Sequence, residues 1–154
     1  MFASVLACAG GGAWALGPRV TAKSLLVVGA SILVLLLTGL FLGRRTLLTN
    51  AFNRRMAGFI VLATSGLVCN RVAAALAGRR PDEILRDDLL LIGVVIVAAS
   101  IGMVRDLWVC AVLVGAAYGA ICLWSDLATP VFIMTSVALL ALGTVILERG
   151  RRDA

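Results

Sequence analysis

Histidine is missing from this chain, and charged and aromatic residues are scarce. Without histidine, the usual zinc sites, histidine-ligated haem and histidine-based acid–base catalysis are excluded. Aromatic side chains make up 6% of the residues, too few to suggest a platform that stacks nucleic-acid bases. Charged residues make up 14%, against about 25% in soluble globular domains. A water-soluble globular fold is therefore excluded, because the chain could not cover its apolar surface with polar groups.

Apolar residues take the place of the missing polar ones. They make up 62% of the 154 residues, and the mean hydropathy is +1.08. This composition predicts an all-α, polytopic integral membrane helix bundle that forms a single transmembrane domain over residues 1–154. The Ala-, Leu-, Val- and Arg-rich composition is typical of small multi-pass proteins of the bacterial cytoplasmic membrane.

Six apolar runs separated by short charged segments predict six transmembrane helices. Ser24–Gly43 is the clearest run, with 20 uncharged residues between Lys23 and Arg44, or about 30 Å of helix. The first run, Met1–Pro18, contains four glycines; its alternative is a mobile or interfacial arm, which would leave five spans. Short turns predict antiparallel neighbours. The expected helices cover residues 2–17, 24–43, 56–78, 84–104, 107–125 and 129–147.

Basic residues gather between alternate spans, and their placement predicts an orientation. The chain has 14 Lys+Arg and 8 Asp+Glu. Because cytoplasmic loops are enriched in Lys and Arg, we assign the more basic side, which includes the C-terminus, to the cytoplasm. The basic residues on this side are Arg44, Arg45, Arg54, Arg55, Arg105, Arg149, Arg151 and Arg152. Those on the opposite side are Arg19, Lys23, Arg79, Arg80 and Arg86.

Two arginine pairs flank the loop between the expected helices 24–43 and 56–78. As a helix, this loop would place Leu48, Ala51 and Phe52 on one side. Two interpretations stay open: an inner interfacial segment that binds anionic lipid headgroups, and an ordinary cytoplasmic loop that sets topology. Basic pairs between apolar runs indicate a membrane surface rather than a nucleic-acid interface, so no nucleic-acid partner is expected. The candidate headgroup residues are Arg44, Arg45, Arg54 and Arg55.

Arg71 lies inside an apolar run and is the most informative residue. In a helix over 56–78 it would lie about 6 Å from the membrane centre, where a charge costs roughly 2.5–3.5 kcal/mol on insertion scales. Three interpretations stay open: Arg71 snorkels to the outer headgroups, lines an ion or substrate path, or forms an ion pair. For a pair we expect Asp126 ahead of Asp88, because a short turn fixes Asp126 in place. The neighbouring Asn70 is a candidate for a hydrogen bond across helices.

Small residues recur four positions apart on three of the expected helices. This spacing lets helix backbones approach closely and favours association in lipid. The contacts could lie within one monomer or between copies of the chain. The candidate helix-packing residues are Gly39, Gly43, Ala98, Gly102, Ala111, Gly115 and Gly119.

Motifs that carry chemistry are absent from the sequence. It contains no GxSxG elbow, Walker loop, GxGxxG fingerprint or paired catalytic carboxylates. The four cysteines lie in apolar runs without a CxxC pair, which indicates packing residues. The acids of the segment Asp82–Asp88 are interleaved with arginines, which indicates ion pairing at a helix start rather than a cation site. We therefore expect no enzyme activity, no cofactor and no metal.

The remaining function classes are structural. The sequence predicts a subunit that self-associates, or that anchors and regulates a membrane partner, without catalytic activity of its own. The alternative is a small channel or transporter in which Arg71 lines the path.

Overall fold

The computed structural model describes residues 21–102 and 104–152, which form helices joined by short turns, with no strand among them. The long helices are α2 (Ala22–Leu42), α4 (Ala51–Leu76), α5 (Pro81–Gly102), α6 (Trp108–Leu123) and α7 (Ala128–Arg152). The short ones are α3 (Arg44–Leu47) and the 3-10 helices η2 (Arg105–Leu107) and η3 (Ser125–Leu127). The predicted all-helical class is confirmed for this part of the chain.

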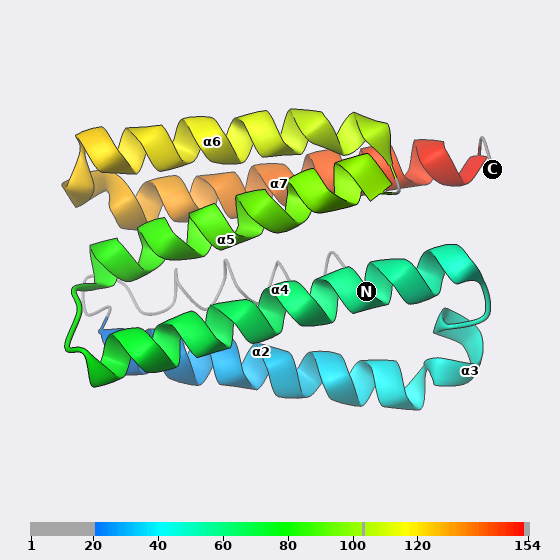
Figure 1. Ribbon diagram of the computed structural model, residues 1–154, viewed down its shortest axis with the longest axis horizontal. Helices are drawn as coiled ribbons and strands as arrows, with labels where there is room; N and C mark the ends of the chain where they lie inside the picture. Colours follow the sequence, from blue (N-terminus) through cyan, green and yellow to red (C-terminus); the bar gives the residue numbers. More distant parts are fainter. Residues whose placement is uncertain (1–20, 103, 153–154) are drawn as a thin grey trace.

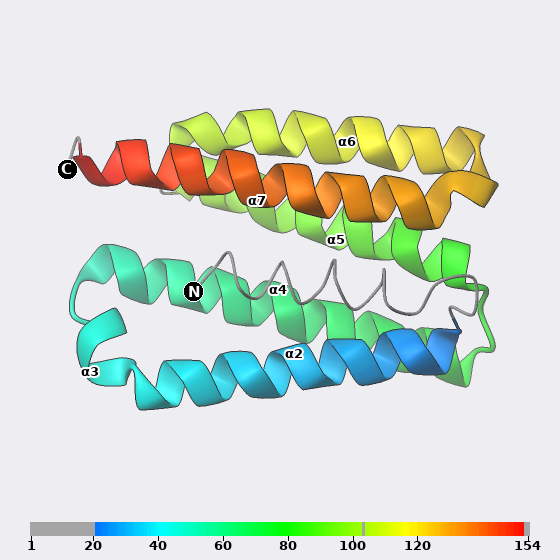
Figure 2. The same cartoon turned by 180° about the vertical axis from the view of Figure 1, so that it is seen from behind.

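The long helices form two antiparallel pairs with α5 between them. Figure 1 shows α2 beside α4 on one side of the bundle and α6 beside α7 on the other. Figure 2 shows the same order from behind. Because α5 contacts α4, α6 and α7, it connects the two pairs.

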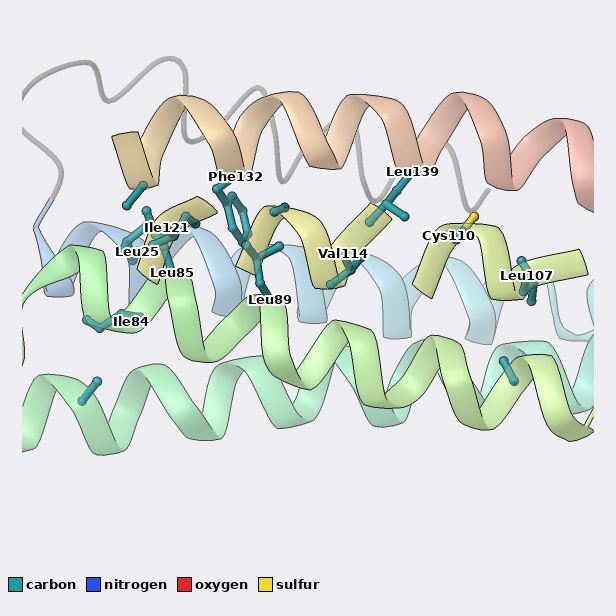
Figure 3. Close-up of a cluster of buried hydrophobic side chains, with 14 residues drawn as sticks. Leu25, Ile84, Leu85, Leu89, Leu107, Cys110, Val114, Ile121, Phe132 and Leu139 are labelled. Carbon is teal, nitrogen blue, oxygen red and sulfur yellow. The ribbon is translucent and has the colours of Figure 1, made fainter. Parts of the chain in front are cut away.

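The buried core lies largely between α5, α6 and α7. Leu85 and Leu89 of α5 are almost fully buried, and Figure 3 shows Phe132 of α7 pointing toward α5 near Leu89. A glycine allows α6 to approach α5, because a Cβ atom at Gly93 would lie 3.2 Å from Cγ1 of Val114. Close packing of Gly93 against the branched side chain of Val114 therefore joins α5 to α6.

The outward faces of the helices are also apolar. Leu35 on α2, Leu62 on α4 and Met134 on α7 are between 63% and 70% exposed. A helix that is hydrophobic all round is typical of a membrane span or of the core of a large protein. These faces are therefore suited to contact with lipid chains.

Four helices are long and apolar enough to cross a membrane: α2, α4, Arg105–Leu123 and Ser125–Ile146. The prediction of six spans is not supported. The expected helix at 2–17 lies outside the described residues. The expected helix at 84–104 is present as α5, whose 22 residues are long enough, but its first half carries five charged residues: Asp82, Glu83, Arg86, Asp87 and Asp88. The chain is thus a helical protein of the integral membrane class with at least these four apolar helices.

The start of α4 differs from the sequence prediction. The helix begins at Ala51 rather than at 56, because the side chain of Asn50 accepts a hydrogen bond of 2.7 Å from the backbone N–H of Asn53 and caps it. Arg54 and Arg55 therefore lie in the first turns of α4. The segment 44–55 is not one interfacial helix; it is divided between α3, a turn and the start of α4.

A tight turn joins α4 to α5 and sets their register. The backbone N–H of Arg79 donates to Ala74 O at 3.0 Å, and that of Gly78 donates to Ala75 O at 3.4 Å. Gly78 has a φ of 63°, a left-handed conformation that glycine adopts without steric cost. This arrangement is a Schellman motif, which ends a helix, and α5 begins at Pro81, whose ring suits a first helical position. The turn is therefore short, and the end of α4 faces the start of α5.

Most charged residues of the described part of the chain lie near the two ends of the bundle, which are at the left and right of Figure 1. We call the end that holds α3, the starts of α4 and α6 and the C-terminal end of α7 the arginine end. The opposite end, with the α4–α5 turn and η3, is the mixed-charge end, where acids and bases are about equal in number. The arginines of the arginine end are Arg44, Arg45, Arg54, Arg55, Arg105, Arg149, Arg151 and Arg152.

Candidate functional site

A buried ion pair joins α4 to α5. Nε of Arg71 donates to Oδ2 of Asp88 at 2.8 Å, and the side chains are 6% and 0% exposed. A second hydrogen bond runs from Nη1 of Arg71 to the backbone O of Leu25, also at 2.8 Å. One guanidinium therefore connects three helices, α2, α4 and α5.

The carboxylate of Asp88 has a second partner on α4. Nδ2 of Asn70 donates to Oδ1 of Asp88 at 2.9 Å. Both carboxylate oxygens thus accept a hydrogen bond from adjacent residues of one helix. A buried charge is tolerated when it is paired and its remaining hydrogen bonds are satisfied, and Asp88 meets both conditions.

Two features of the backbone allow this site to form. The short α4–α5 turn brings residues 17 positions apart in sequence into contact. On α2, Gly29 leaves room for the guanidinium, because a Cβ atom there would lie 3.0 Å from Nη1 and 3.4 Å from Cδ of Arg71. Sequence reasoning missed both Gly29 and the Leu25 carbonyl. A glycine inside the most apolar span is a weak signal for such a contact, and the carbonyl leaves no signal in the sequence.

A cavity of about 150 Å³ extends from this site between the two helix pairs. Along α4 its lining runs from Met56 to Arg71, or roughly 22 Å at 1.5 Å per residue. The facing wall on α7 runs from Phe132 to Gly143. The lining is mainly apolar, and its hydroxyl groups bond within their own helices: Thr64 donates to Ile60 O, and Ser136 to Phe132 O, each at 2.8 Å. Arg71 is the charged residue of the described lining.

The structure excludes one predicted role of Arg71 and identifies its partner. The side chain forms an ion pair and is buried, so it does not snorkel to the headgroups. The expectation that Asp126 precedes Asp88 as its partner is wrong. Asp126 is exposed in η3, between α6 and α7, whereas the α4–α5 turn places Asp88 directly against Arg71. The expected hydrogen bond of Asn70 across helices is present.

The small-residue candidates lie mostly outside the core. Added Cβ atoms at Gly102, Gly115 and Gly119 would meet nothing within 4 Å among the described residues. Ala98 and Gly115 are exposed, and Ala111 and Gly119 are half-buried. At the end of α2, the backbone O of Gly39 accepts from Gly43, the C-cap residue. These strips therefore do not supply the close contacts of the monomer, which Gly29 and Gly93 supply instead.

The charged residues at the two ends behave differently. At the mixed-charge end, Arg79 pairs with Asp87 at 2.8 Å and Arg80 with Asp82 at 3.1 Å, as local ion pairing predicts. At the arginine end, Arg44 lies over the ring of Phe41, 5.0 Å from its centroid, a cation–π contact. The candidate headgroup residues Arg44, Arg45, Arg54 and Arg55 are all exposed.

The described residues hold no cluster of metal-ligating side chains. Within residues 21–102 and 104–152, no three Cys, Asp or Glu side chains are arranged to hold a metal ion. Comparisons of the chain with family models, with curated proteins and with solved structures found no match. The features of the described residues that bear on function are the buried ion pair, the cavity and the outward surfaces.

Proposed function

We propose that the bundle crosses the membrane with α5 as a fifth span beside the four apolar helices. A hydropathy count treats Asp88 as an unpaired charge and so disfavours α5 as a span. In the structure, however, its carboxylate is fully buried and paired with Arg71. The insertion cost of each charge is therefore offset by the other, and the remainder of α5 from Leu89 onward is uncharged. Exposed tryptophans at the two ends of α6, Trp108 and Trp124, support this placement, because tryptophan favours the membrane interfaces.

We further propose that the protein is a structural or interaction subunit that self-associates or binds a membrane partner, without catalytic activity. The observation that carries this proposal is the open strip on α6, formed by Ala111, Gly115 and Gly119. Close approach at small residues favours helix association in lipid, and Cβ atoms added at Gly115 and Gly119 would meet nothing within 4 Å among the described residues. The buried ion pair of Arg71 and Asp88, by contrast, holds α2, α4 and α5 together.

Replacing Gly115 with leucine is expected to lower the particle mass in detergent by one or more protomers of 16.0 kDa. The larger side chain would keep a second helix from approaching the strip, while the open space around Gly115 leaves the monomer folded. Light scattering of the purified protein measures the mass. Gly58→Leu is the matched control, since Gly58 on α4 also has open space around it.

An unchanged mass for Gly115→Leu would remove the α6 strip as the association surface. A monomeric unmodified protein would remove self-association and leave only a different membrane partner.

A channel or transporter is the second candidate function, and one observation favours it: Arg71 lines the cavity between the helix pairs. Anion flux into liposomes that hold the purified protein tests this candidate. Passage above that of empty liposomes, with a change in ionic selectivity for Arg71→Lys, would favour a conduit over a structural subunit.

The arginine end is proposed to face the cytoplasm of a bacterial cell, with its exposed arginines near anionic headgroups. Cytoplasmic flanks of membrane helices are enriched in Lys and Arg, and anionic lipids attract such residues. This orientation places the C-terminus inside and the α4–α5 turn outside.

Single cysteines at Thr49 and Asp126, each in a background without the four natural cysteines, test the orientation. We expect a membrane-impermeant thiol reagent added to intact cells to label position 126 and to spare position 49. Permeabilised cells provide the control, in which both positions react. Labelling of position 49 in intact cells would reverse the orientation.

A further inference from the structure

We propose that the cavity between the helix pairs binds one acyl chain of a membrane phospholipid, with a free N–H of Arg71 donating to the ester carbonyl of that chain. This proposal depends on the bundle lying in a bilayer. It does not depend on self-association.

The shape and chemistry of the cavity suit a single chain. The cavity is narrow and follows α4 between Met56 and Arg71, with α7 opposite. Its volume of about 150 Å³ matches an apolar cavity that stays dry and binds benzene. It therefore holds a section of one chain and not two. Because Thr64 and Ser136 bond within their own helices, the walls offer little to water, and a hydrocarbon is the better occupant.

The polar end of the cavity can hold an acceptor. A guanidinium has five N–H donors, and Arg71 uses two of its nitrogen atoms for the bonds to Asp88 and Leu25. Arg71 lines the cavity, and one of the further donors is assigned to a group that enters along it. Arg71 lies five residues before Leu76, the last residue of α4, or about 7.5 Å along the helix axis. This depth is close to the level at which ester groups meet the hydrocarbon core.

Charge balance favours an ester over a free carboxylate. The positive charge of Arg71 is already balanced by Asp88 at 2.8 Å. A fatty-acid carboxylate would bring a second negative charge into a buried site, and an unbalanced buried charge is strongly unfavourable. An ester carbonyl accepts a hydrogen bond without adding charge. The acyl chain then enters at Arg71, from the leaflet at the mixed-charge end, and extends along the cavity toward Met56 through the membrane centre.

Photo-crosslinking in nanodiscs tests whether an acyl chain occupies the cavity. The probe is a phosphatidylcholine that carries a diazirine on one acyl chain, and mass spectrometry maps the labelled residues. We expect labels on the cavity walls of α4 and α7. Ala63→Phe, which fills the cavity, should reduce these labels at least tenfold. Leu62→Phe is the matched control on the exposed face of α4, and it should leave them unchanged. Labels confined to outward faces, or equal effects of the two variants, would overturn the proposal.

Ester and ether lipids test the role of Arg71. Native mass spectrometry of the purified protein compares retention of a diester phosphatidylcholine with that of its diether analogue, which lacks the carbonyl oxygens. Loss of one hydrogen bond from a charged donor predicts about tenfold weaker retention of the ether lipid. Equal retention would remove Arg71 as the donor. A monomeric protein that still retains the diester lipid would sustain this inference while refuting self-association, so the two failures are distinguishable.

Discussion

Replacing Arg71 with leucine is expected to lower the free energy of unfolding by about 3–5 kcal/mol. The change removes the partner of Asp88, whose side chain is fully buried, and leaves a carboxylate uncompensated between the helices. It also removes the hydrogen bond that Nη1 of Arg71 donates to the backbone O of Leu25 on α2. Unfolding by sodium dodecyl sulfate in mixed micelles, followed by tryptophan fluorescence, measures the loss. A snorkelling arginine would behave in the opposite way, since its removal would be neutral or stabilising.

The double change Arg71→Leu with Asp88→Leu should recover much of that loss, because a buried ion pair replaced by apolar residues is often neutral or stabilising. The matched comparison is Arg71→Leu with Asp126→Leu, in which the exposed aspartate makes no contact with Arg71, so the two effects should add. If the effects of Arg71→Leu and Asp88→Leu simply add, the two residues do not form an ion pair. If stability is recovered with Asp126→Leu and not with Asp88→Leu, Asp126 is the partner of Arg71.

Replacing Gly29 with leucine is expected to destabilise the bundle by about 1–3 kcal/mol, the usual range for overpacking. Even the first added carbon would lie 3.0 Å from Nη1 of Arg71, so the guanidinium must move away from Leu25 or α2 must move away from α4. The same unfolding measurement applies. Gly66→Leu on α4 is the control, since a Cβ atom at Gly66 meets nothing within 4 Å.

Gly29→Ala should give a smaller loss than Gly29→Leu, because a single methyl group requires a smaller displacement. Equal stability of Gly29→Leu and Gly66→Leu would show that α2 does not pack closely against the arginine.

Local sequence patterns predict the helices well, but they do not predict which helices meet. The uncharged run between Lys23 and Arg44 matches α2 to within two residues. The sequence prediction started this helix at 56 because Arg54 and Arg55 resemble loop residues. Asn50 caps the helix before them, so both arginines lie within α4. Hydropathy treats each charge on α5 alone, so it cannot recognise that Asp88 is neutralised by a residue on another helix.

Contacts in space explain the rest of the difference. Arg71 was identified because a charge inside an apolar run is rare, yet its partner depends on the packing of α4 against α5. Asp88 and Asp126 look equivalent along the chain. They differ only because the Gly78 turn brings one of them beside Arg71, while the other lies at the far helix pair. The spacing of small residues does not show which face of a helix points into the bundle. In the structure, Gly115 lies on an exposed face and Gly29 on a buried one.

The short connection between Arg71 and Asp88 has a consequence for biogenesis. Ribosomes deliver α4 before α5, and an isolated α4 would enter the lateral gate of the translocon with an unpaired arginine, at a cost below the roughly 2.5–3.5 kcal/mol of a central position because Arg71 lies nearer the end of the helix. Only 17 residues separate the two charges, so α5 follows within seconds at ordinary elongation rates. The α4–α5 hairpin is therefore suited to partition into lipid as one unit, with its ion pair already formed.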